Sequence, residues 1–266
     1  MEKGMPTSNV VKDDFSWEIP IESVPLPSRG IIYNPDTKLY NTELVQIKAM
    51  TALEEDILSS VAYIKEGTSV IRAIQSCIVD KTIDVSNMIL GDRNALMISM
   101  RITGYGSDYN VHSRCQQCNH QNDITVKLDS LGIKRLTQEP VNTGENLFEY
   151  TLPVTNKRVL FRLLTHKDEK EQEIKKSRME KAGIVSENSV TSYLESSIVS
   201  IDGIDDRNKI SHFIKAMPAR DSRSLRLHMR DIEPGIDMTW NYKCVKCGHA
   251  NDISLPITSE FFWPST

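Results

Sequence analysis

The residues best suited to chemistry are five cysteines, four of which form two CxxC pairs. Cys115 and Cys118 make the first pair, and Cys244 and Cys247 make the second. A tight turn between two such cysteines lets both sulfurs point at one ion, and four thiolates satisfy the tetrahedral coordination of Zn²⁺. We therefore predict one structural metal site, with these four side chains as ligands and zinc as the metal. An iron centre of the rubredoxin type or an iron–sulfur cluster is the less favoured alternative.

The two CxxC segments resemble each other beyond their cysteines. CQQCNHQNDITV (115–126) and CVKCGHANDISL (244–255) share Cys, Cys, His, Asn, Asp and Ile at the same offsets. The residue after the second cysteine often needs a positive φ, which Gly248 adopts without strain and Asn119 tolerates. We therefore expect the same turn in both segments, with backbone amides that face the thiolates.

Two histidines also recur at one offset, immediately after these turns. His120 and His249 are alternative metal ligands. Because two cysteines from each segment already fill four positions, we predict instead that the histidines flank the site, where they could donate hydrogen bonds to the ligands.

Alternating apolar residues on both sides of each CxxC predict two zinc-knuckle hairpins that meet in space. Residues 119–243 separate the pairs, a gap of 125 residues. We expect residues 105–128 and 236–266 to form one metal-centred module, with residues 129–235 as an α/β segment inserted into it. Because the entropy cost of loop closure grows slowly with loop length, this large loop is tolerable.

The sequence contains no arrangement of residues typical of an enzyme. GxSxG, Walker, HExxH and GxGxxG patterns are all absent. A site closed by four cysteines offers no open position for metal catalysis. A CxxC between two strands also differs from the thioredoxin arrangement, in which it begins a helix. We predict that the chain is not an enzyme.

Composition and charge limit the kinds of molecule that the chain is expected to bind. The chain has 266 residues, of which 39% are hydrophobic and 26% charged, and its formal net charge is −4. This acidic balance favours neither nucleic acid nor an anionic membrane as a partner. No apolar stretch approaches the ~20 residues that span a bilayer, and the first residues are polar. We expect a soluble protein made in a cytoplasm.

The N-terminal half divides into an arm and a helical region. Prolines throughout residues 1–42 predict an extended arm, whose segment 24–35 lies either on a partner or on the chain's own core. Residues 43–104 carry apolar residues at helical spacing, which predicts helices at 51–67, 69–79 and 90–103. Cys77, on an apolar helix face, is most simply a core residue.

The inserted segment mixes strands and helices. Its patterns predict a hairpin at 147–164, a charged solvated helix at 166–183 and a helical region from 189 to 231 that contains a short strand at 196–202. A last helix is expected at 217–232, with Asp221 as a candidate cap. Four arginines on that helix form a basic ridge, for which a solvated face is favoured over a phosphate-binding role: Arg220, Arg223, Arg226 and Arg230.

These elements together predict an α+β fold. It has a helical N-terminal half, a small antiparallel sheet that carries both knuckles, and a helical insertion between them. The tail FFWP (261–264) adds large aromatic side chains that pack either on the chain's own core or on a partner. Removal of residues 261–266 would spare the fold in the second case and damage it in the first.

The order of several motifs resembles the baseplate hub and hub-assembly proteins of T-even-type contractile-tailed bacteriophages. The resemblance covers nearly the whole chain. It depends on the following segments, together with the two knuckles: LPSRGIIY (26–33), MTALEEDIL (50–58), LGDRNALMISMRITGYG (90–106) and FFWP (261–264).

This resemblance implies a non-enzymatic, late-expressed tail protein. Such a protein would act in the hub region of the baseplate, as a part of the virion or as an assembly factor, in a hetero-oligomeric complex with other baseplate and hub proteins. The alternative from the residues alone is a zinc-ribbon adaptor that binds nucleic acid or a transcription complex, which the acidic net charge disfavours.

Overall fold

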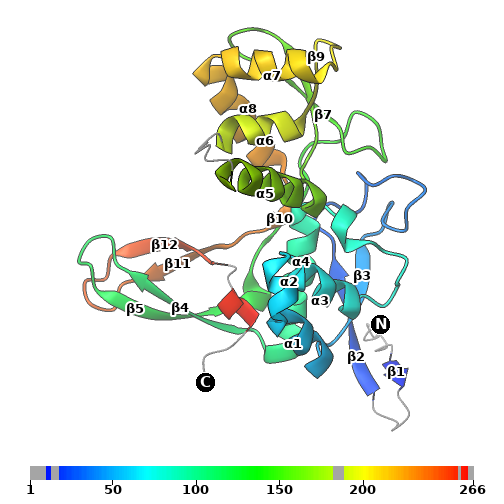
Figure 1. The fold of residues 1–266 in the computed structure, drawn as a ribbon. Coiled ribbons are helices and arrows are strands. Elements are labelled where there is room, and N and C mark those ends of the chain that lie inside the picture. The colour runs from blue at the N-terminus through cyan, green and yellow to red at the C-terminus, as the bar shows by residue number, and fades with distance from the viewer. Residues whose placement is uncertain (1–9, 13–17, 182–188, 257–258, 263–266) are drawn as a thin grey trace, which may run out of the picture.

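The computed structural model describes residues 10–12, 18–181, 189–256 and 259–262. Its fold is α+β, as predicted, with helices and several small antiparallel sheets. Figure 1 shows a body in which the helices of the inserted segment lie above the N-terminal half, and two long hairpins that project together from one side of it.

A small antiparallel sheet, in the order β1-β2-β3, begins the described chain. It consists of β1 (Val10–Lys12), β2 (Glu18–Pro25) and β3 (Leu44–Lys48). Between β2 and β3 the chain turns repeatedly, and it buries Leu26 and Ile32 in the main core. Of the two interpretations that the sequence left open for residues 24–35, the structure therefore shows packing on the chain's own core.

The helices of the N-terminal half match the predicted segments, with one difference. They are α1 (Ala52–Ser59), α2 (Val61–Lys65), α3 (Ser69–Cys77) and α4 (Leu90–Tyr105). The predicted helix 51–67 is broken at Ser60, whose ψ of 114° ends α1 and whose side chain accepts a hydrogen bond from the backbone of Tyr63 to begin α2. Cys77 is buried, and burial raises the pKa of its thiol to about 12.

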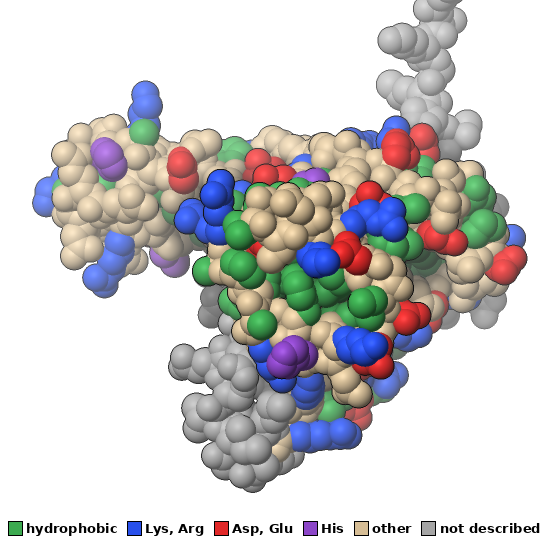
Figure 2. All heavy atoms as spheres, turned by 90° about the horizontal axis from the view of Figure 1, so that it is seen from above, with side chains coloured by type: hydrophobic (Ala, Val, Ile, Leu, Met, Phe, Trp, Pro, Cys, Tyr) green, Lys and Arg blue, Asp and Glu red, His purple; other side chains and the backbone are tan. Residues whose placement is uncertain are grey.

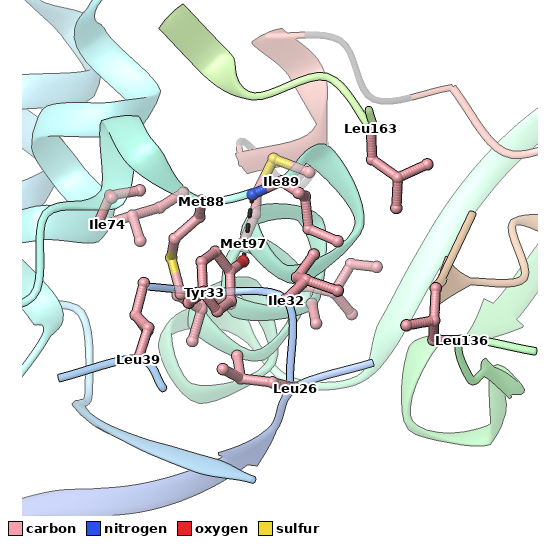
Figure 3. Close-up of a cluster of buried hydrophobic side chains, with 14 of the residues drawn as sticks. Leu26, Ile32, Tyr33, Leu39, Ile74, Met88, Ile89, Met97, Leu136 and Leu163 are labelled. Carbon is pink, nitrogen blue, oxygen red and sulfur yellow. Dashed lines mark hydrogen bonds between the residues drawn. The ribbon is translucent and has the colours of Figure 1, made fainter. Parts of the chain in front are cut away.

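The N-terminal half is organised around one buried carboxylate on α4. Asp92 accepts hydrogen bonds from the backbone of Ser28 at 2.9 Å and from the hydroxyl of Tyr33 at 2.6 Å. The Tyr33 hydroxyl in turn accepts one from the backbone of Ile89 at 3.2 Å (Figure 3). Figure 3 shows apolar side chains from the 26–39 turns, from α3 and α4 and from the insertion around this point, among them Leu163. Hydrogen bonds and apolar packing thus fix the N-terminal turns against α4.

The inserted segment consists of a three-stranded sheet and a group of helices. The sheet has the order β7-β8-β9 and comprises β7 (Phe148–Thr151), β8 (Arg158–Phe161) and β9 (Ile198–Ile201). The helices are α5 (His166–Lys181), α6 (Ser189–Ser197), α7 (Arg207–Ala216) and α8 (Ala219–Ile232). Two short strands pair at the ends of the segment: β6 (Ile133–Lys134) and β10 (Gly235–Ile236).

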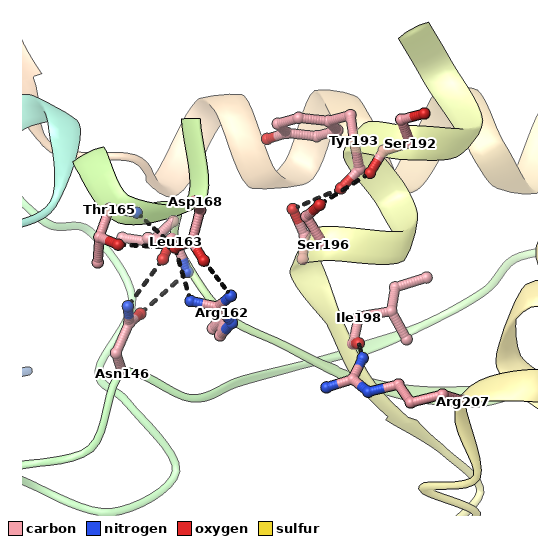
Figure 4. A network of polar contacts seen from close by, with 11 residues as sticks. Asn146, Arg162, Leu163, Thr165, Asp168, Ser192, Tyr193, Ser196, Ile198 and Arg207 are labelled. Carbon is pink, nitrogen blue, oxygen red and sulfur yellow. Dashed lines mark hydrogen bonds and ion pairs between the residues drawn. The ribbon is translucent and has the colours of Figure 1, made fainter. Parts of the chain in front are cut away.

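Buried polar side chains hold the loops of this segment. Asn146 brackets the backbone of Leu163, to which it donates at 2.8 Å and from which it accepts at 2.9 Å, and Asp168 binds Arg162 nearby (Figure 4). Asp221 does not cap α8, which begins at Ala219. Its carboxylate instead accepts hydrogen bonds from the β7–β8 turn. The predicted cap is therefore wrong, because α8 begins two residues before Asp221, which lies inside its first turn.

Glu54, at the start of α1, gives the stability of the fold a dependence on pH. Burial alone would raise its pKa, but hydrogen bonds from Ser76, Thr51 and Lys48 outweigh this and lower it from 4.5 to about 2. Because the folded pKa lies below the unfolded one, the stabilisation is present above pH 4.5 and is lost as the pH falls toward 2. We expect Glu54→Gln to lower the free energy of unfolding at pH 7 by about 2 kcal/mol and to flatten its fall below pH 4.5.

Urea titrations between pH 2 and pH 7 measure this effect. Asp56→Asn is a matched control, since Asp56 is exposed on the same helix. If the Glu54 and Asp56 variants depend on pH alike, Glu54 is not the linked group.

Candidate metal centre

Two antiparallel hairpins carry the CxxC pairs. The first pairs β4 (Asp108–Arg114) with β5 (Gln121–Lys127), and the second pairs β11 (Thr239–Lys243) with β12 (Ala250–Ser254). In both, the six residues between the strands form the turn that holds the cysteines. Figure 1 shows the hairpins side by side, with both turns at the end away from the body.

The four cysteine sulfurs converge at this end. All four lie within 4.8 Å of one another. Across the hairpins, the sulfurs of Cys115 and Cys247 are 3.6 Å apart, as are those of Cys118 and Cys244. A disulfide would require about 2.05 Å, and all four cysteines are free. The predicted meeting of the two knuckles is therefore confirmed as geometry.

Both turns have the conformation that the sequence predicted. Asn119 has a φ of 56° and Gly248 a φ of 71°. The backbone amides of these two residues donate at 2.9 Å to the carbonyls of Cys115 and Cys244, respectively. The small or flexible residue after the second cysteine thus closes each turn.

Two buried asparagines join the turns, and the sequence analysis did not assign them a role. The side chain of Asn122 accepts a hydrogen bond from the backbone amide of Val245 in the other hairpin, at 3.0 Å. Asn251 accepts one from the amide of Gln116, also at 3.0 Å. Each asparagine donates at 2.9 Å to the carbonyl of the histidine in its own turn. Their signal in the sequence was visible: both stand seven residues after the first cysteine of their pair.

The histidines lie beside the sulfur cluster without joining it. Among the described residues, the side chains gathered as potential metal ligands are the four cysteines. His120 and His249 contribute their backbone carbonyls, which accept hydrogen bonds from the amides of Cys115 and Cys244 at 2.9 Å.

Backbone amides face the sulfurs and favour their ionised form. The amide of Cys118 contributes most to lowering the pKa of Cys115, which falls to about 6. Burial opposes ionisation of Cys244, but the amides of Cys247 and Lys246 outweigh it, so that its pKa also falls. These hydrogen bonds match the amide arrangement that the sequence predicted around the thiolates.

Cys247 differs from Cys115 and Cys244, because its pKa is raised. The amide of His249 lowers its pKa, but partial loss of hydration and the three neighbouring cysteine sulfurs raise it to about 12. The four adjacent sulfurs therefore oppose one another's ionisation, and a divalent cation among them would offset this repulsion.

Phe261 and Phe262 dock at the base of the hairpins. Phe261 and Phe262 are buried, and the ring of Phe261 meets that of Tyr109 edge to face at a centroid distance of 5.2 Å. The side chain of Arg101 donates to the carbonyl of Phe261 at 2.8 Å. These two phenylalanines pack on the chain's own core, whereas Trp263 lies outside the described residues.

The arginine ridge lies on α8, between the two hairpins in the chain. Arg220, Arg223 and Arg230 are exposed and Arg226 is half-buried. Arg230 forms an ion pair with the adjacent Asp231 at 3.1 Å. This arrangement agrees with a solvated helix face.

A comparison with models of protein families shows the family to which the chain belongs. A family model described as "T4 bacteriophage base plate protein" matches residues 32–263. The chain belongs to this baseplate family. The match covers the N-terminal turns from Ile32 onward, both knuckles and the whole insertion, and it confirms the resemblance found in the sequence.

Two other comparisons add nothing to the family assignment. No curated protein matches the chain, and no solved structure matches it. Within the described part of the chain, none of the helices is long and apolar enough to cross a membrane.

Proposed function

We propose that this baseplate-family protein is a structural or assembly component of the hub region of a contractile phage tail. Membership of the baseplate family over residues 32–263 is the observation that supports this role. In this role the chain catalyses no reaction, and its neighbours are other baseplate and hub proteins in a hetero-oligomeric complex within the virion. It would be made in the host cytoplasm and assembled there.

We further propose that the four cysteines hold one structural Zn²⁺ ion. A tetrahedral site with Zn–S bonds of about 2.3 Å places its sulfurs about 3.8 Å apart. The two sulfur pairs at 3.6 Å and the limit of 4.8 Å for all four fit this arrangement. An all-thiolate set leaves no position for water, which suits a structural metal, and zinc fits better than iron because it favours closed tetrahedral thiolate sites.

The metal would hold together segments that are distant in the chain. We propose that residues 105–128 and 236–266 form one metal-centred module and that residues 129–235 are inserted into it. The short β6–β10 pair lies near the two ends of the insertion and brings them together. Residues 1–42 and 43–104 then make up the arm and the helical region on which the module stands.

A combined measurement on virus particles and on the isolated protein tests this function. Mass spectrometry of purified tails and of baseplate assembly intermediates should detect the chain in at least one of them. Metal analysis of the purified protein should give about one zinc ion per chain. Absence of the chain from both particles would refute the baseplate role, and a metal-free protein with reduced cysteines would refute the zinc site.

A further inference from the structure

The end of the paired hairpins carries a charge opposite to that of the whole protein. We call residues 113–122 and 242–251 the knuckle tip. The only charged side chains in these two ranges, apart from the cysteines, are Arg114, Lys243 and Lys246, whereas the whole chain has a net charge of −4. None of the three forms an ion pair with another described residue. Figure 2 shows the hairpins projecting at the left, with Lys and Arg side chains at their outer end.

The knuckle tip also exposes an apolar side chain. Val245, between the two cysteines of the second turn, is 80% exposed, more than any other large hydrophobic residue that the structure describes. It stands next to Lys246. The side chain of Val245 adds nothing to the chain's own core and is accessible to another molecule.

The first knuckle shows that the turn does not need these side chains. Gln116 and Gln117 occupy the positions that correspond to Val245 and Lys246. The backbone amides of Gln116 and Val245 make equivalent 3.0 Å hydrogen bonds to the opposite asparagine. Because the same turn forms with two glutamines, the side chains of the valine and the lysine are not required for the structure of the turn.

We propose that the knuckle tip docks into another protein subunit of the baseplate, at an apolar recess rimmed by carboxylates. Val245 would enter the recess, and the three cationic side chains would meet the acidic rim. This inference rests on the proposed function, which supplies baseplate subunits as the partners.

A nucleic acid fits the tip less well than a protein does. Phosphate contacts would use the cations but leave the valine without a role. Tyr242, the one Phe, Tyr or Trp residue within the knuckle tip, is half-buried, and its hydroxyl donates to Ser113 at 3.1 Å, so it is not free to stack on a base.

A matched pair of double variants tests the docking. Val245→Gln with Lys246→Gln places between the cysteines of the second knuckle the two glutamines found in the first. Val61→Gln with Lys65→Gln removes the same side-chain types from α2, where Val61 is 65% exposed. The full-length wild-type protein and both variants would each be titrated by calorimetry against every remaining baseplate subunit of the same virus, purified one at a time. A DNA duplex at low salt would be titrated in the same way. Zinc content is measured for all three proteins.

The expected result is one subunit that binds wild type and the α2 variant equally but binds the tip variant at least about tenfold more weakly. Its affinity for wild type should fall as salt is raised. Equal binding of the tip variant, absence of binding to every subunit, or DNA binding that depends on the tip would overturn the docking proposal. Loss of zinc from the tip variant would do so as well, since the side chains would then serve the knuckle. None of these outcomes affects the separate test of the proposed function, which detects the chain in purified tails or assembly intermediates by mass spectrometry.

Discussion

Removal of the metal with a chelator is expected to separate the two hairpins and to lower the melting temperature by about 10 °C or more. Structural zinc sites in small peptides contribute ~10–16 kcal/mol of apparent binding free energy, and loss of even 3–5 kcal/mol would produce such a shift. Without a cation, the sulfurs around Cys247 oppose one another's ionisation. Calorimetric melting with and without chelator measures the change, and limited proteolysis should then cut within residues 239–254.

Variants locate the effect at the cysteine cluster. Cys244→Ser with Cys247→Ser should abolish zinc binding and remove the response to chelator. Cys77→Ala, at the cysteine outside the cluster, should keep zinc binding and the response to chelator, whatever its own effect on core packing. Unchanged melting of a metal-free wild-type protein would contradict a structural role for the ion.

Replacement of Arg101 by methionine should destabilise the fold by about 3 kcal/mol and release the C-terminal segment. This side chain is 1% exposed and donates to three backbone carbonyls: Phe261 at 2.8 Å, Gly106 at 2.9 Å and Asp108 at 3.2 Å. Methionine fills a similar space but donates no hydrogen bond, so the carbonyl of the buried Phe261 is left without its donor, and an unsatisfied buried group costs ~1–3 kcal/mol. Urea unfolding gives the loss of stability, and hydrogen exchange reports whether residues 259–262 open.

Two further variants separate charge from geometry. Arg101→Lys keeps the positive charge but cannot form the three-way fork, so its stability should lie between those of wild type and the methionine variant. Arg114→Met, at an exposed arginine on β4, should change the free energy of unfolding by less than about 0.5 kcal/mol. Equal losses in the Arg101 and Arg114 methionine variants would mean that the hydrogen bonds to the tail contribute nothing.

The local parts of the fold could be predicted because their causes lie within a few residues. The turn after each second cysteine depends on whether the next residue tolerates a positive φ, and Asn119 and Gly248 reveal this directly. The helix break at Ser60 was missed because the apolar spacing continues through it. Only the backbone conformation and the new cap separate α1 from α2.

The long-range parts could not be predicted from one sequence. The pairing of β2 with β3 depends on how residues 26–42 fold back on the core, which no local pattern specifies. The roles of Asn122 and Asn251 depend on a contact across 123 residues or more, although their common offset was a usable signal. The meeting of the cysteines could be predicted because the number of ligands that a tetrahedral metal needs exceeds what either hairpin supplies.

Helix α4, one of the segments that carry the family resemblance, holds separate parts of the chain together. On α4, Gly91 allows the backbone of Pro234 to approach so closely that a Cβ atom would lie 1.8 Å from its carbonyl oxygen. Its neighbour Arg93 binds Glu169 of α5. This helix thereby contacts the insertion as well as the N-terminal turns and the tail.

The reciprocal hydrogen bonds of the two asparagines couple the folding of the two hairpin ends. Each turn donates one backbone hydrogen bond to an asparagine side chain of the other hairpin, and each contributes half of the sulfur cluster. Neither hairpin by itself can form the hydrogen bonds between the turns or complete the sulfur cluster. We therefore expect the two hairpin ends to fold and unfold together.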